Sequence, residues 1–240
     1  MSNGGLLAHM GNGLQGALLL ARGRADGMLL LASQEEPALL VARRSFWAAA
    51  LCLPAFVCLQ LIGLAQSPGL PPHFAHGLAL QLLGYVIDWA GFALLSRGAV
   101  RAMGRLDAWP RFITAWNWCN VVQYLLLVAA SLPPLLGLPD ILGETAWLVA
   151  TGWALWIEWY ATRIALGVGG LPAAALVLLD EVLGFALLAL IQMLPGGGAG
   201  GAGRGDGVRA AGADPVAAGR GDVAGQEVGR RRSAAIRRLS

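Results

Sequence analysis

Long apolar stretches fill most of the chain between Ser45 and Leu194 and are separated by short connections rich in proline, glycine and arginine. A helix of 20 residues covers ~30 Å, which matches the hydrocarbon core of a bilayer. Since unpaired backbone groups in lipid cost several kcal/mol each, these stretches must be helical there. The pattern predicts five membrane-spanning helices, at residues 45–65, 77–96, 112–132, 141–161 and 171–194.

The regions on either side of these spans differ from them in composition. Residues 1–44 hold two short apolar stretches, one broken by glycines and one by Glu35, Glu36 and Pro37, and these are typical of surface or interfacial helices. Residues 195–240 are rich in Gly, Ala and Arg and lack the apolar residues that would offset ordering entropy, so we predict a disordered tail. The abrupt change of composition also raises the hypothesis that a frameshift replaced an earlier C-terminus.

The overall composition excludes an ordinary soluble domain. Hydrophobic residues make up 57% of the chain and charged residues 13%, against roughly 25% charged in globular domains. The fold class is therefore predicted to be all-α, a polytopic transmembrane bundle with about five spans and a disordered C-terminal tail. The net charge of +3 comes with eight arginines in the tail, so we expect no nucleic-acid partner. Three cysteines inside apolar stretches, without a CxxC spacing, indicate neither a disulfide framework nor a metal site.

Arginines are distributed unevenly among the connections. They precede the first span and occupy the second and fourth connections, while the first and third connections contain none. Because cytoplasmic connections carry an excess of positive charge, the pattern predicts a bacterial inner-membrane protein with a cytoplasmic N-terminus. The arginines concerned are Arg22, Arg24, Arg43, Arg44, Arg97, Arg101, Arg105, Arg111 and Arg163.

Polar residues recur at one depth in the predicted spans. Asp88, Asn120 and Asp180 each lie nine residues from the cytoplasmic end of a span, about 13 Å deep at helical rise. The adjacent pair Asp180 and Glu181 costs roughly 5–7 kcal/mol to insert, which cancels most of the gain from the apolar residues of its span. Such groups must be protonated, partnered or in a wet cavity. The candidate intramembrane polar site comprises Asp88, Asn117, Asn120, Tyr124, Glu158, Asp180 and Glu181.

Glycines recur every seven residues in and around the second span, and Asp88 lies on their stripe. Small residues let a neighbouring helix approach closely, and Gly184 shares a face of the last span with Asp180. We therefore predict helix packing at Gly77, Gly84, Gly91, Gly98 and Gly184. Two interpretations of the polar layer stay open, namely interhelical hydrogen bonds worth ~0.6 kcal/mol each and a site for a proton or solute.

The stretch GYVIDWAGFALLSRGAVRAMGRLDAWPRFITAWNWCNVVQ, with its span, basic connection and second span, resembles bacterial members of the Yip-domain family of membrane proteins. The resemblance covers roughly residues 45–194 and implies a bundle of five closely spaced helices after a polar N-terminal region. The Gly/Arg-rich tail departs from the family pattern. Eukaryotic relatives act in membrane trafficking and bind small GTPases, but no residues of this chain match a motif for such a partner.

The sequence as a whole favours a non-enzymatic bundle that organises the membrane or binds a partner. Its expected partners are the lipid bilayer and either a second copy or another membrane protein, with no cofactor. The alternative is a small-solute or proton-coupled transporter that uses Asp88, Asn120, Glu158 and Asp180. A lipid-handling enzyme is disfavoured because no nucleophile lies beside a base, so no catalytic residue is predicted.

Overall fold

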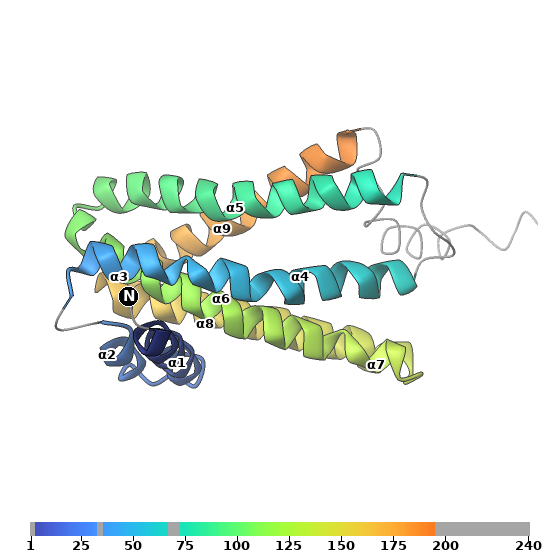
Figure 1. The fold of residues 1–240 in the computed structure, drawn as a ribbon, viewed down its shortest axis with the longest axis horizontal. Helices are drawn as coiled ribbons and strands as arrows, with labels where there is room; N and C mark the ends of the chain where they lie inside the picture. Colours follow the sequence, from blue (N-terminus) through green and yellow to red (C-terminus); the bar gives the residue numbers. More distant parts are fainter. Residues whose placement is uncertain (1–2, 33–35, 67–72, 195–240) are drawn as a thin grey trace, which may run out of the picture. The chain divides into compact units, whose positions relative to one another are not determined.

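A computed structural model describes residues 3–32, 36–66 and 73–194, and all regular structure in these ranges is helical (Figure 1). The predicted all-α fold is confirmed for this part of the chain. The predicted disordered tail, residues 195–240, lies outside the described residues. The long helices are α4 (Trp47–Ala65), α5 (Phe74–Ala102), α6 (Trp109–Ala130), α8 (Asp140–Leu166) and α9 (Gly170–Met193).

Four of the predicted spans correspond to elements that are long and apolar enough to cross a membrane, at residues 38–65, 74–102, 106–135 and 170–193. The chain is therefore a helical membrane bundle. The helix predicted at 141–161 is present as α8, 27 residues long, but it is not among these four. Glu144, Glu158 and Arg163 interrupt the apolar sequence of α8. A fifth crossing stays a prediction that rests on the length of α8.

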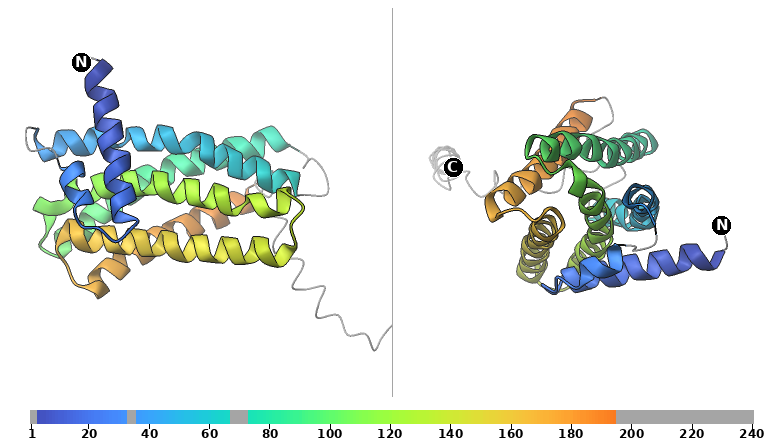
Figure 2. Two further views of the ribbon diagram at one scale, coloured as in Figure 1. Left: turned by 90° about the horizontal axis from the view of Figure 1, so that it is seen from below. Right: turned by 90° about the vertical axis from the view of Figure 1, so that its left-hand side faces the viewer.

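The N-terminal region contains α1 (Asn3–Leu20), α2 (Gly27–Leu31) and α3 (Ala38–Ser45). In Figure 2, α1 runs across the long helices, and α1 and α2 pack against each other. Only Phe46, which has helical dihedral angles, separates α3 from α4, so the first apolar element begins at Ala38. The predicted boundary at Ser45 is thus too late for this element.

Helix α6 lies at the centre of the described bundle and contacts α8, α4, α3 and α1. Its residues from Phe112 to Cys119 are all buried, because neighbours surround the helix on every side. The large side chains of Phe112, Ile113 and Trp118 fill the core there. Helix α5 packs mainly against α9, and α9 in turn packs against α8.

The arginines of the described residues lie near one end of the bundle. The sequence predicted this, because two of the connections between the predicted spans contain no arginine. Figure 1 places α3 at the same end as the connection between α5 and α6, which contains the short helix η1 (Leu106–Ala108). Arg111 Nε donates a hydrogen bond to the Ala165 carbonyl at 2.7 Å, which brings the end of α8 to this place. The other end, where α7 (Leu132–Leu135) precedes α8, has no arginine in residues 131–140.

Two glycines of the predicted packing stripe allow α5 and α9 to approach closely. A Cβ atom at Gly84 would overlap the side chain of Ile191, and one at Gly91 would lie 3.4 Å from Leu183 Cδ2. Gly77 is buried. The packing prediction is wrong for Gly98 and Gly184, where an added Cβ would meet no atom within 4 Å among the described residues. Gly98 is exposed, away from the contact with α9, and Gly184 borders a cavity.

Candidate functional site: an acidic cavity beside α5 and α9

Three carboxyl groups line a cavity of about 240 Å³. Asp88 comes from α5, while Asp180 and Glu181 come from α9, so the crossing of these two helices brings the groups together. The remaining walls are Gly184, Phe185 and Leu188. The structure thus places three residues of the predicted intramembrane polar site around one cavity.

Glu158 of α8 extends the acidic group into the core. Its carboxyl group and that of Asp180 lie within hydrogen-bonding reach of each other. Glu158 is only 5% exposed, and its Oε1 atom has no hydrogen-bond partner among the described residues. We call Asp88, Glu158, Asp180 and Glu181 the acidic cluster, which runs from the cavity to the space between α8 and α9.

An indole group orients the central carboxyl of the acidic cluster. Trp116 Nε1 donates a hydrogen bond to Asp180 Oδ2 at 3.0 Å. The Trp116 ring is itself held between the rings of Trp89 and Phe92, with centroid separations of 5.0 and 4.5 Å. By contrast, Asp88 Oδ1 is buried without a partner among the described residues. Asp180 is therefore held more firmly than Asp88.

No arginine in the described part of the chain forms an ion pair with the acidic cluster. Arg163, one turn beyond Glu158, lies over the ring of Trp159, with its guanidinium carbon 4.7 Å from the ring centroid. Within the described ranges, no group of His, Cys, Asp and Glu side chains has an arrangement that could hold a metal ion. Four carboxyl groups in a membrane bundle without a counter-charge need protons, a cation or water.

The amides of the predicted polar layer do not join the acidic cluster. Asn117 is fully buried on another side of α6 and donates a hydrogen bond to Ser45 Oγ of α3 at 2.7 Å. Asn120 donates to the backbone carbonyl of Trp116 in its own helix, at 3.0 Å. The prediction of a shared site is wrong for these two because depth in the membrane does not determine the direction of a side chain around its helix.

Tyr124 of α6 lies near the acidic cluster. Its ring contacts that of Tyr85, with centroids 6.2 Å apart, and its hydroxyl is close enough to Asp88 and Asp180 to interact electrostatically. Three site residues were not predicted, namely Trp116, Phe185 and Leu188. Helical spacing offered a signal for them, since Trp116 is one turn before Asn120 and Phe185 is one turn after Glu181.

The acidic cluster can thus hold a proton, with Trp116 fixing the position of Asp180. Phe185 and Leu188 add apolar side chains to the wall of the cavity. Comparison with protein-family models, with curated proteins and with solved structures finds no match to this chain.

Proposed function

We propose that this protein binds a proton at the acidic cluster and carries it, alone or with a solute, across the membrane. The observation that supports the proposal most directly is the meeting of four carboxyl groups from α5, α8 and α9 without a basic partner in the described residues. Because an unpaired carboxylate is costly in a bilayer, the uptake of a positive charge at this place is favourable.

A purely structural role explains these groups less well. An interhelical hydrogen bond in a membrane contributes ~0.6 kcal/mol on average, whereas an Asp at the centre of a span costs ~2.5–3.5 kcal/mol. Asp180 has a donor in Trp116, but Asp88 Oδ1 and Glu158 Oε1 have none among the described residues. The few hydrogen bonds of the acidic cluster therefore do not offset the free energy of placing its carboxyl groups in the membrane.

Burial of the carboxyl groups increases along the acidic cluster from the cavity to the core, as a proton relay requires. Asp88 and Glu181 are half-buried at the cavity, Asp180 follows, and Glu158 is almost completely enclosed. Carboxyl groups within hydrogen-bonding reach, as Asp180 and Glu158 are, can pass a proton from one to the other. The acidic cluster therefore supplies the segment of the proposed path that leads from the cavity to Glu158 in the core.

A second candidate is the non-enzymatic partner-binding bundle favoured by the sequence. The cavity is open at the surface of the bundle, since Phe185 in its wall is 68% exposed and Leu188 is 40% exposed. A second copy or another membrane protein that presents a basic side chain would cover this opening and neutralise Asp180. The gathering of arginines at one end supports a cytoplasmic N-terminus in a bacterial inner membrane, and the relation to the Yip-domain family stays a proposal.

Purified protein in lipid vesicles with an enclosed pH-sensitive dye tests the proposed transport. We expect a pH gradient to drive proton flux above that of protein-free vesicles. Asp180→Asn should lower this flux by at least about tenfold, which corresponds to ~1.4 kcal/mol in the barrier. The matched control is Glu144→Gln, which changes an exposed acid of α8 near the opposite end and should leave the flux unchanged.

Absence of proton flux under proton, sodium and potassium gradients would contradict the transport proposal and leave the partner-binding candidate. In that case Asp180→Asn should instead alter the oligomeric state or the set of cross-linked membrane partners. Equal losses of flux in Asp180→Asn and Glu144→Gln would also contradict the assignment, because only one of these residues belongs to the acidic cluster.

A further inference from the structure

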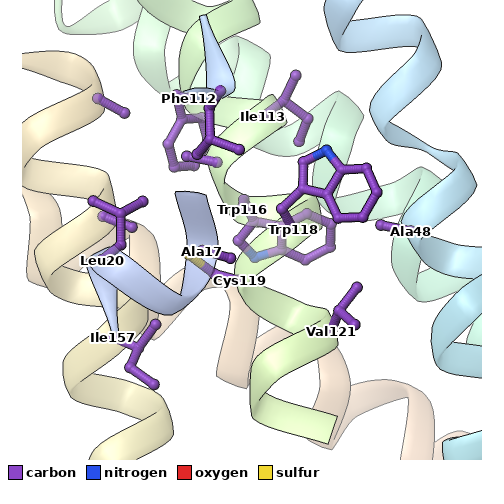
Figure 3. Packing of buried hydrophobic residues seen from close by; sticks show 14 of the residues in the cluster. Ala17, Leu20, Ala48, Phe112, Ile113, Trp116, Trp118, Cys119, Val121 and Ile157 are labelled. Atoms are coloured by element: carbon purple, nitrogen blue, oxygen red, sulfur yellow. The ribbon is translucent and has the colours of Figure 1, made fainter. Parts of the chain in front are cut away.

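The hairpin of α1 and α2 covers part of the core face formed by α6 and α8. The two helices of the hairpin touch through Gly16 and Gly27, where a Cβ atom would overlap the opposite backbone. Ala17 and Leu20 of α1 are completely buried. Ala17 and Cys119 of α6, both labelled in Figure 3, belong to the same buried cluster, and Cys119 is only 1% exposed. The hairpin therefore contributes to the core that encloses Cys119.

Two side chains of α8 hold the C-terminal end of α1. Trp153 Nε1 donates a hydrogen bond to the Ala21 carbonyl at 3.1 Å, and the Tyr160 hydroxyl donates one to the Gly23 carbonyl at 2.7 Å. Gly23 has a positive φ of 75°, which favours glycine at this turn. These bonds satisfy backbone carbonyl groups of the turn that follows α1.

The other end of the hairpin contact contains a titratable group. The His9 ring meets the ring of Trp118 edge-on, with centroids 5.9 Å apart. Its Nε2 atom is buried and has no hydrogen-bond partner among the described residues. The charged groups that act on it are Arg44 of α3 and Glu36, which form an ion pair at 2.6 Å. Helix α2 has no titratable residue, and the titratable side chain of α6 near this contact is Cys119.

A positive charge on His9 is unfavourable in this position. Burial lowers the pKa of His9 below its ordinary value of about 6.5, Arg44 lowers it further, and Glu36 acts in the opposite direction. An imidazolium would be attracted to the Trp118 ring, but its Nε2–H would have no acceptor. The docked hairpin thus favours neutral His9. Docking is strongest above the undocked pKa and weakens as the pH falls through it.

We propose that the α1–α2 hairpin is a pH-sensitive cover, which protonation of His9 releases from α6 so that Cys119 becomes accessible. The release requires no movement of α5 or α9 and is independent of the proposed transport. Trp153 and Tyr160 keep the hairpin near α8 while its His9 end moves away. Acidification therefore opens one defined face of the bundle.

The natural cysteines report this release directly. The full chain in lipid nanodiscs is treated with N-ethylmaleimide at about pH 8 and at about pH 5.5, a range in which histidine changes its charge. Mass spectrometry then gives the labelling rate of Cys119 relative to Cys52. Cys52 of α4 is equally buried but lies outside the hairpin contact, so the ratio removes the general effect of pH on thiol reactivity.

We expect the ratio of Cys119 to Cys52 labelling to rise several-fold at the lower pH. His9→Phe should abolish the rise, and His9→Arg should produce the high ratio already at about pH 8. Tyr160→Phe, which removes the hydrogen bond to the Gly23 carbonyl, should raise the ratio at both pH values. The rise of the ratio at the lower pH should remain in this variant. An unchanged ratio, an equal rise at both cysteines, or a rise that persists in His9→Phe would each overturn the proposal.

Discussion

At the scale of single residues, one missing methyl group decides how closely α1 approaches α6. A Cβ atom at Gly13 would overlap the indole ring of Trp118, while a Cβ atom at Gly11, in the same helix, would meet nothing within 4 Å. The two glycines look alike in the sequence. Only the position of Trp118, more than 100 residues away in the chain, distinguishes them.

Substitution of these two glycines should have opposite effects on stability. Alanine in a helix interior is more favourable than glycine by up to ~1 kcal/mol, so we expect Gly11→Ala to stabilise α1. Gly13→Ala should lower the free energy of unfolding by ~1–3 kcal/mol, because the indole has to shift. Thermal unfolding in detergent, followed by tryptophan fluorescence, measures the difference. Equal effects of the two substitutions would show that α1 does not dock on Trp118.

Individual acids of the site differ in how far the sequence predicts their roles. The cost of placing Asp180 and Glu181 in an apolar stretch is enough to identify both as candidate site residues. The orientation of Asp180 by Trp116 was not predictable, because that hydrogen bond joins residues 64 positions apart. The free energy of inserting an acid into the membrane depends on the local sequence. The hydrogen-bond partner of that acid depends on how two helices pack.

At the scale of elements, the last turn of α8 is capped by a side chain from another helix. The Arg111 Nε atom donates to the Ala165 carbonyl at 2.7 Å, one of the carbonyl groups that the helix end leaves free. The positive charge also lies at the negative end of the helix dipole. Gly167, with φ of 62°, ends the helix next to it.

Loss of this contact should weaken the junction of α6, α8 and α9. We expect Arg111→Ala to lower the free energy of unfolding by ~1–3 kcal/mol, since a charged hydrogen bond to a carbonyl and a dipole interaction are both lost. Arg101→Ala is the control, because Arg101 is exposed near the end of α5. Urea or heat denaturation in detergent would compare the two variants, and a similar loss in both would contradict the capping role.

At the scale of the whole molecule, the number of crossings depends on α8. With a fifth crossing by α8, the connection around Gly137 and the connection around Val168 lie on opposite sides of the membrane. Without it, the two connections lie on one side. The arginines near Val168 and their absence near Gly137 favour opposite sides.

Reporter fusions should decide between four and five crossings. An alkaline phosphatase that is active only outside the cytoplasm should be active when fused after Gly137 and inactive when fused after Val168. A fusion after Arg105, in the arginine-rich connection, is the inactive control. Equal activity of the first two fusions would contradict the five-span topology. It would also require α8 to lie outside the hydrocarbon core, although α6 contacts it along the bundle.

The sequence by itself determined the helices, four of the apolar spans and the end of the bundle that carries the arginines, and it predicts the intramembrane depth of the acids. Each of these properties follows from a local count, because a bilayer requires helices of a set length and each residue advances a helix by 1.5 Å.

Only the tertiary structure decided which side chains meet. It brought Glu158 to Asp180, turned Asn117 towards Ser45, left open space beside Gly98 and Gly184, and placed Gly13 of α1 against Trp118. Rotation about a helix axis and the choice of neighbouring helices follow from packing between distant parts of the chain, and local spacing in the sequence does not contain that information.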